Sequence, residues 1–194
     1  MERPARWSGL AIALHWLAGA LILELIAHGF VMVHAPLGAA TAFDLYQSHK
    51  SLGFVVLALT AARLAARAAS RAPAPAASAR WERLLAALVQ AALYALTIAA
   101  VAAGWLVVST SPLPIPTQFF GLFVIPDISR PDAALFAAAT LAHEATAWSI
   151  AGLVALHVAG ALKHHFFDRD DVLMRMLPRW AWRPGGGEGA PHSP

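Results

Sequence analysis

The chain has 194 residues, of which 59% are hydrophobic and only 13% are charged, and its mean hydropathy is +0.59. Because soluble globular domains carry about 25% charged residues, this composition predicts a polytopic membrane protein in a lipid bilayer. The chain contains no cysteine, which excludes disulfides, iron–sulfur clusters, thiolate metal sites and haem attached through a Cys-x-x-Cys-His motif. The net charge of +3 is expected to reflect membrane topology, with no nucleic-acid partner.

Four apolar stretches, each long enough to cross a bilayer as a helix, follow one another along the chain. We expect them at about residues 10–33, 48–67, 84–108 and 141–165. The prolines between 68 and 79 and the SPLPIP motif after 108 cannot continue a helix, and a longer connection containing FFGLFVIPDISRPD leads to the last stretch. The pattern predicts an all-α fold, an integral membrane four-helix bundle in one domain over 1–183, with a disordered tail over 184–194.

Lysine and arginine are distributed unequally between the two sides of this predicted bundle. All of them except Lys50 and Arg130 fall on the side that carries the N-terminus. Cytoplasmic segments of membrane proteins carry the excess of basic residues. The distribution therefore predicts that both termini are cytoplasmic.

Histidines occur inside three of the four predicted spans. His143 and His157 are separated by four helical turns less about 40°, so both leave nearly the same face of one helix, about 21 Å apart along its axis. His15 matches the depth of His157, and His49 matches the depth of His143. Because ionisable residues inside a membrane are costly and mark functional sites, we predict that each pair supplies the axial ligands of one haem, with one haem in each leaflet.

Glycines follow three of these histidines by about one helical turn, the third being Gly160 after His157. Gly19 comes four residues after His15, and Gly53 comes four residues after His49. A planar macrocycle needs small neighbours beside its ligand, although small residues also promote close helix packing in membranes. The alternative for each single histidine is a core residue that is hydrogen-bonded to a neighbouring helix.

Two further polar residues lie on the histidine-bearing stripes near the cytoplasmic side. His164 is two turns beyond His157 and could contact a quinone head group or a haem propionate, or could simply lie at the membrane interface. Arg63 follows His49 by the same four-turn spacing, which places it at the depth of the inner haem. It could pair with propionates, since arginine binds carboxylates in a bidentate way, or it could be a snorkelling anchor.

The outer half of the bundle carries three other polar residues of interest. Lys50 could pair with propionates of the outer haem or attract a small anion toward it. Glu24 and His28 form an i, i+4 pair that faces away from His15 on the same helix. An intramembrane acid allows a proton path, and the alternative is an interhelical hydrogen bond or a partly hydrated helix end.

Several stretches of the sequence resemble one family over nearly the whole chain. They are LHWLAGALI around His15, SHKSLGFVVLALTAARLAAR from His49, LYALTIAAVAAGW in the third span, FFGLFVIPDI in the connection, an HE and LH pair fourteen residues apart, and KHHFFDRDDVLMRMLP. With these motifs the sequence resembles the bacterial cytochrome b561 family, four-helix dihaem proteins of the inner (cytoplasmic) membrane related to the cytochrome b subunits of hydrogenases. The axial ligands of the family map onto His15, His49, His143 and His157.

The resemblance implies two non-covalent b-type haems, an inner one between His15 and His157 and an outer one between His49 and His143. It also implies electron exchange with ubiquinone or ubiquinol and, for some members, oxidation of superoxide at the outer face. The chain departs from the family at two positions of the third span. Gln90 stands where members commonly carry histidine, and Val101 where they often carry proline.

The favoured hypothesis is a transmembrane electron conduit between an outer-face donor, such as superoxide near Lys50, and ubiquinone. It would act as a superoxide:ubiquinone or quinol oxidoreductase. One alternative is a cytochrome b subunit that anchors a partner dehydrogenase or hydrogenase and passes its electrons to quinone. A second alternative is a haem-free helical membrane protein whose histidines are only packed. The sequence does not determine the physiological donor, the type of quinone or the oligomeric state.

Overall fold

The computed structural model describes residues 6–70, 72–73, 79–113 and 115–178. Within these ranges the chain forms four long helices, α1 (Gly9–His34), α2 (Ala39–Ala69), α3 (Arg80–Thr110) and α4 (Ala133–Phe166). Each helix is long and apolar enough to cross a membrane, which confirms the predicted all-α four-helix membrane bundle. The predicted tail at 184–194 lies outside the described residues.

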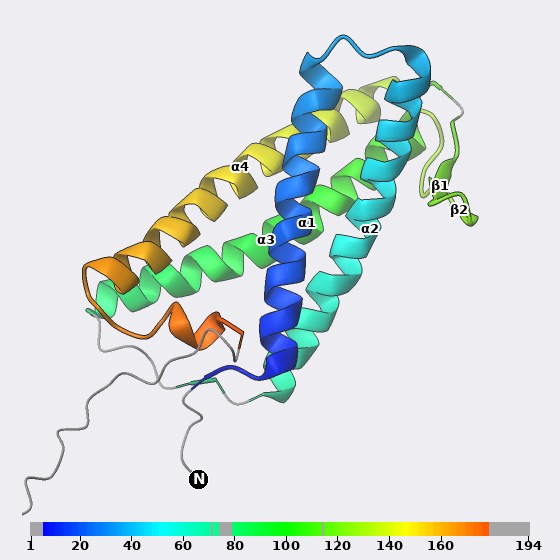
Figure 1. Ribbon diagram of the computed structural model, residues 1–194. Coiled ribbons are helices and arrows are strands. Elements are labelled where there is room, and N and C mark those ends of the chain that lie inside the picture. The colour runs from blue at the N-terminus through cyan, green and yellow to red at the C-terminus, as the bar shows by residue number, and fades with distance from the viewer. Residues whose placement is uncertain (1–5, 71, 74–78, 114, 179–194) are drawn as a thin grey trace, which may run out of the picture.

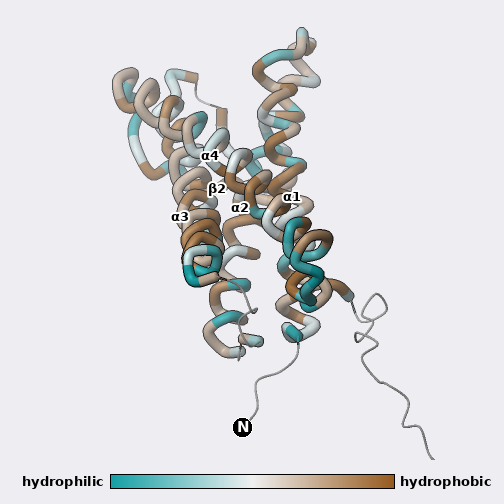
Figure 2. The backbone as a smooth tube through the Cα atoms, turned by 90° about the vertical axis from the view of Figure 1, so that its left-hand side faces the viewer, coloured by the Kyte–Doolittle hydropathy of each residue, from teal (hydrophilic) through white to brown (hydrophobic). Residues whose placement is uncertain are grey.

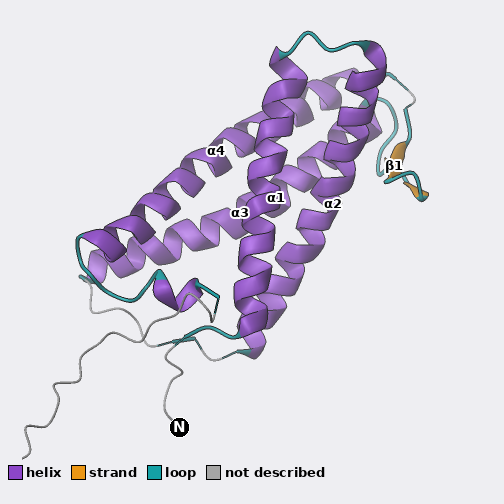
Figure 3. Cartoon of the chain, viewed as in Figure 1, coloured by secondary structure: helices purple, strands orange, loops and turns teal. Residues whose placement is uncertain are grey.

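The four helices are arranged as two antiparallel pairs, α1 with α2 and α3 with α4, and the second pair is inclined to the first (Figures 1 and 3). The bundle has a loop end, where α1 is joined to α2 and α3 to α4, and a terminal end, where α1 begins and α4 finishes. Apolar residues occur along most of each helix (Figure 2), and large side chains such as Leu23 and Trp148 are more than half exposed. This distribution fits a protein whose solvent is lipid.

Polar residues inside the helices satisfy their hydroxyl groups locally. Thr97, Ser109 and Thr110 are buried, and each donates a hydrogen bond to the backbone carbonyl four residues earlier. This bond keeps a hydroxyl compatible with an apolar surrounding. At the helix starts, Ser8 caps α1 through the amide of Ala11, and Asp132 caps α4 through the amide of Leu135.

Helices α2 and α4 begin well before the apolar stretches at 48–67 and 141–165 that were expected to cross the membrane. The added turns, from Ala39 and from Ala133, are rich in alanine, a strong helix former. The sequence hydropathy delimits the part of a helix that suits lipid, whereas helical propensity and capping decide where the helix itself begins.

The connection between α3 and α4, for which the sequence analysis expected no strand in an all-α fold, contains an antiparallel hairpin of β1 (Thr117–Phe119) and β2 (Phe123–Ile125). Its turn places Phe120 and Gly121 at positive φ, a conformation that glycine adopts without strain. The hairpin lies beside α2 near the loop end (Figure 1). Each strand has only three residues, so the alternation of buried and exposed side chains that marks a strand was too short to be recognised in this proline-rich segment.

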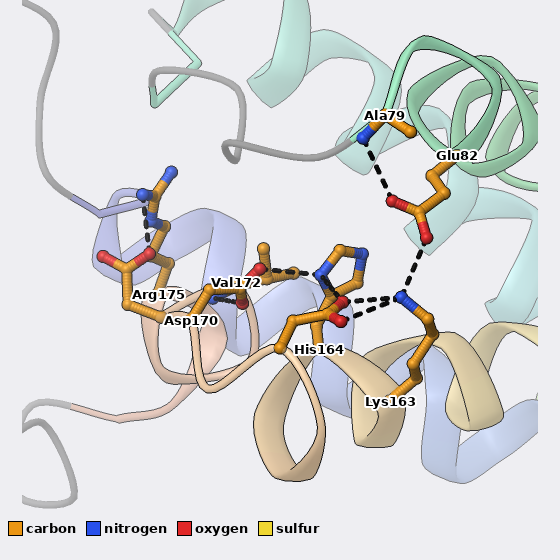
Figure 4. A network of polar contacts seen from close by, with 9 residues as sticks. Ala79, Glu82, Lys163, His164, Asp170, Val172 and Arg175 are labelled. Atoms are coloured by element: carbon orange, nitrogen blue, oxygen red, sulfur yellow. Dashed lines mark hydrogen bonds and ion pairs between the residues drawn. The ribbon is translucent and has the colours of Figure 1, made fainter.

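At the terminal end, residues 167–178, including the short 3-10 helix η1 (Met174–Met176), fold back toward the start of α1. Trp16 donates its indole N–H to the carbonyl of Met176 at 2.7 Å, and Arg6 donates to the carbonyl of Leu177 at 2.6 Å. Lys163 forms an ion pair with Glu82 at 2.8 Å, which ties the end of α4 to the start of α3 (Figure 4). This segment closes the terminal end of the bundle.

Candidate functional site: two histidine pairs inside the bundle

The structure brings together the histidines that the depth argument paired. The ring centres of His15 on α1 and His157 on α4 are 6.0 Å apart. The ring centres of His49 on α2 and His143 on α4 are 6.2 Å apart. We call these the terminal-end pair and the loop-end pair. Helix α4 therefore contributes one ring to each pair, and the helices of the other hairpin contribute the partners.

The spacing of the rings fits two imidazoles that share one metal ion. With metal–nitrogen bonds of about 2 Å and about 1 Å from each nitrogen to its ring centre, two axial imidazoles have centres about 6 Å apart. Both observed separations, 6.0 Å and 6.2 Å, match this value. If the histidines were only core residues packed against a neighbouring helix, nothing would require the two pairs to have the same separation between ring centres.

In the loop-end pair, helix α3 fixes the orientation of the His143 ring. Its Nδ1 lies 2.8 Å from the carbonyl oxygen of Ala100. Because a carbonyl only accepts, Nδ1 carries the proton and the lone pair of the neutral ring is on Nε2. Hydrogen bonds of this kind set the tautomer of metal-binding histidines. Gly104, one turn further along α3, leaves room for the ring, since a Cβ there would lie 3.0 Å from Cε1 of His143.

The partner ring in the loop-end pair has a nitrogen without a hydrogen bond. Nδ1 of His49 is buried, and no protein group in the described part of the chain bonds to it. Gly29 of α1 packs against the same ring, where a Cβ would lie 3.8 Å from Cε1. A buried nitrogen of this kind costs free energy unless that nitrogen itself gains a partner.

A cavity of about 210 Å³ lies beside the loop-end pair, enclosed by all four helices and by β1. Its walls are mainly apolar and include Gly53, as well as Val101 at the position of the family's proline. A Cβ added at Gly53, or at Gly19 near the terminal-end pair, would meet no atom within 4 Å. The space predicted beside His15 and His49 is therefore open. The spacing, the tautomer of His143 and this space together fit a bound macrocycle.

The terminal-end pair has a different neighbour. Nη2 of Arg63 lies 3.1 Å from Nδ1 of His15, and the guanidinium carbon lies 5.1 Å from the ring centre of Tyr94. Because arginine only donates, Nδ1 of His15 accepts in this arrangement and the ring's own proton is on Nε2, so His15 would have to give up the contact with Arg63 or the proton on Nε2 to bind a metal. Arg63 was predicted at this depth as a partner of propionates, and in the structure it contacts the histidine itself.

Comparisons with known proteins point to one family. The family model described as prokaryotic cytochrome b561 matches residues 6–179. The chain is 33% identical over 175 residues to cytochrome b561 homolog 2 of Escherichia coli (strain K12), covering 90% of this chain and 92% of that protein. It is 29% identical over 182 residues to cytochrome b561 homolog 1 of the same organism, covering 90% of this chain and 98% of that protein.

The chain belongs to the prokaryotic cytochrome b561 family. It is therefore a multi-pass bacterial membrane protein of electron transfer, and the family implies haem b as its cofactor. Among the four long helices, α3 contributes no histidine to either pair. Its contribution, the carbonyl of Ala100 and the space above Gly104, was missed by the sequence analysis. A backbone carbonyl has no sequence signature, although the AAGW motif could have indicated a close approach.

The other predicted site residues of this cytochrome lie at opposite ends. Lys50 lines the loop-end cavity, and its Nζ lies 3.4 Å from the carbonyl oxygen of Pro116. His164 lies at the terminal end, where its Nδ1 is 2.7 Å from a carboxylate oxygen of Asp170 and 3.1 Å from one of Asp168 (Figure 4). A quinone or propionate at His164 would therefore have to use the other ring nitrogen.

The structure also places a third histidine beside the loop-end pair. The ring centre of His28 is 6.4 Å from that of His49, and its Nε2 lies 3.3 Å from Glu24. The helical spacing had indicated only that Glu24 and His28 face away from His15. The rotation of α1 against α2 turns His28 toward His49, and that rotation cannot be read from the spacing along one helix.

Proposed function

We propose that this cytochrome holds two haem b groups, one between His15 and His157 and one between His49 and His143, and carries electrons across the bacterial inner membrane. The observation that carries the proposal is the repeated 6.0 and 6.2 Å spacing of histidine rings at two depths of one bundle. Haem would supply reversible one-electron transfer, and two histidines at each haem would leave no open position for dioxygen.

The histidines and their neighbours have separate tasks in this proposal. His143 and His157 stand about 21 Å apart along α4, so one rigid helix sets the separation of the two sites. The carbonyl of Ala100 holds the proton of His143 on Nδ1, which leaves Nε2 free to bind. The apolar walls beside the loop-end pair exclude water from that site.

The orientation of the bundle assigns the two ends to the two sides of the membrane. Most described lysines and arginines of α2, α3 and α4, together with Arg6 before α1, gather at the terminal end, namely Arg6, Arg63, Arg67, Arg80, Arg83 and Lys163. By the positive-inside rule this end, with both termini, is cytoplasmic. The loop-end pair then serves the outer face and the terminal-end pair the cytoplasmic face.

We further propose that the protein is a superoxide:ubiquinone oxidoreductase. Superoxide approaches Lys50 at the outer face and leaves as dioxygen after giving up one electron. Two such electrons, with two protons, convert ubiquinone to ubiquinol, and His164 and Arg63 are the proposed contacts of the quinone. Lys50 supports the first half of this proposal, since no other cationic side chain lines the cavity beside the loop-end pair in the described structure.

The decisive experiment is to count haem in purified protein by its pyridine haemochrome and its reduced-minus-oxidised spectrum. We expect two b-type haems per chain, and the loss of a different one in His49→Ala and in His157→Ala. His34→Ala is the matched control, because the contacts of His34 within the described residues are with Phe30 of its own helix, a hydrogen bond to the carbonyl and stacking of the rings. Loss of haem in the control, or one haem that resists both substitutions, would contradict the assignment of the ligands.

A further inference from the structure

The β1–β2 hairpin and the residues before it present apolar side chains on the outside of the molecule. No charged residue occurs from 111 to 126. Phe120, Leu122, Phe123 and Val124 are all more than half exposed, and Leu122 reaches 76%. Exposed apolar residues that are contiguous mark a surface that is covered by something other than water.

Backbone groups of Pro116, Gln118 and Phe120 bind the hairpin to α2. The side chain of Gln47 donates to the carbonyl of Pro116 and accepts from the amide of Gln118. The hydroxyl of the buried Ser51 donates to the carbonyl of Gln118 and accepts from the amide of Phe120. The second bond holds Phe120 at its positive φ of 49°. The hairpin is therefore fixed on α2, and its apolar side chains are left outward.

The point of attachment sets the depth of the hairpin. Gln47 and Ser51 lie eight and twelve residues inside the start of α2 at Ala39, about 12 and 18 Å along its axis. The whole helix is about 46 Å long, whereas the hydrocarbon core of a bilayer is about 30 Å thick. The first turns of α2 therefore project beyond the membrane, and the hairpin lies level with the start of the apolar stretch predicted at 48.

We propose that the β1–β2 hairpin is seated in the membrane interface at the loop end, with Phe120, Leu122 and Phe123 among the lipid head groups and upper acyl chains. Three features favour lipid over a protein partner. The exposed Phe43 and Tyr46 lie on α2 within about one turn of Gln47, so the helix that carries the hairpin is itself apolar there. The hairpin carries no charge that would specify a protein partner, and it is rich in phenylalanine, one of the residues that interfacial segments turn toward lipid.

The position of the hairpin at the membrane interface affects the cavity beside the loop-end pair. Thr117, at the start of β1, is buried and lines that cavity. Contacts of the exposed turn with lipid and the hydrogen bonds from Gln47 and Ser51 of α2 then both hold β1 in place. The membrane itself thus helps to close the cavity toward the outer surface.

The absence of cysteine allows a direct test in the full-length protein, reconstituted in phosphatidylcholine vesicles. A spin label is attached to a single cysteine in Leu122→Cys or, independently, Val124→Cys. Its collisions with dissolved oxygen, which concentrates in lipid, are compared with those with a water-soluble nickel chelate. Ala40→Cys, exposed in the projecting turns of α2, is the water control, and the half-exposed Leu23→Cys in the middle of α1 is the lipid control.

For both hairpin labels we expect the ratio of oxygen collisions to nickel collisions to be at least several-fold higher than for the label at Ala40→Cys. This ratio should approach the value for the label at Leu23→Cys. Nickel access equal to that of Ala40→Cys would place the hairpin in water and overturn the proposal. Protection from both reagents would mean that protein covers the tip, and it would overturn the proposal as well. Neither readout depends on haem or on electron transfer, so the result is independent of the proposed function.

Discussion

The two histidine pairs have nearly the same spacing but different surroundings. In the loop-end pair, the proton of His143 is fixed by a carbonyl and the ring lies over Gly104. In the terminal-end pair, His15 has a guanidinium within 3.1 Å. The first arrangement leaves the lone pair of His143 on Nε2, and the second places a permanent positive charge beside the His15 ring. Equal spacing along the sequence therefore gives two sites with different chemistry, because neighbouring helices supply the difference.

The difference also concerns how each ring is held in place. His143 is held by packing, and a larger residue at Gly104 would strike it. His15 is contacted by a long side chain that can move, since arginine has several rotatable bonds. The loop-end pair should therefore be sensitive to the volume of its neighbours, and the terminal-end pair to their charge.

The largest effect should come from filling the space above His143. Gly104→Leu is expected to abolish haem binding at the loop-end pair and to leave one haem per chain, because even a Cβ would lie 3.0 Å from the ring. Haem content by pyridine haemochrome and low-temperature spectra measures this loss. Gly152→Leu is the matched control, since a Cβ at that exposed glycine of α4 meets no atom within 4 Å. Two intact haems in Gly104→Leu would show that packing does not hold His143.

Removal of the charge beside His15 should have the next largest effect. A cation favours the addition of an electron, so Arg63→Gln is expected to lower the midpoint potential of the terminal-end haem by several tens of millivolts, where about 59 mV is a tenfold change for one electron. Potentiometric titration followed at the haem bands measures the shift.

Two further variants separate the charge of Arg63 from its hydrogen bond. Glutamine retains a donor for Nδ1 of His15, whereas Arg63→Met removes both, so equal shifts in the two variants would assign the effect to charge. Arg67→Gln, whose guanidinium lies over Trp7, is the control. A shift confined to the loop-end haem would contradict the assignment of Arg63 to the terminal-end pair.

The smallest expected effect concerns the approach of an anion to the loop-end cavity. Lys50→Gln should slow reduction of the haems by superoxide several-fold at low ionic strength, with little change at high salt, because the Debye length falls to about 10 Å at 0.1 M. Stopped-flow absorbance after a pulse of superoxide measures the rate. Arg130→Gln removes the other predicted outer cation and serves as the control. An equal slowing in both variants would indicate a general field, and no slowing would remove Lys50 from the proposed path.

The amino-acid sequence by itself determined the class of the molecule and the outline of the site. Composition required a membrane, hydropathy gave four spans, and the helical repeat placed His143 and His157 on one face at two depths. The pairing with His49 and His15 followed because antiparallel spans of similar length bring equal depths together. These features depend on periodicity along one helix, which is a property of the chain alone.

Only the tertiary structure decided what surrounds each ring. The carbonyl of Ala100 reaches His143 because of how α3 packs on α4, and every residue has such a carbonyl. His28 lies beside His49 because of how α1 is rotated against α2, and the helical repeat does not contain that rotation. Nδ1 of His164 contacts a carboxylate because the chain turns back after α4. The hairpin on α2 likewise depends on Gln47 and Ser51 meeting a distant segment. Contacts between helices depend on their packing angle and rotation, and these are set by all the side chains together.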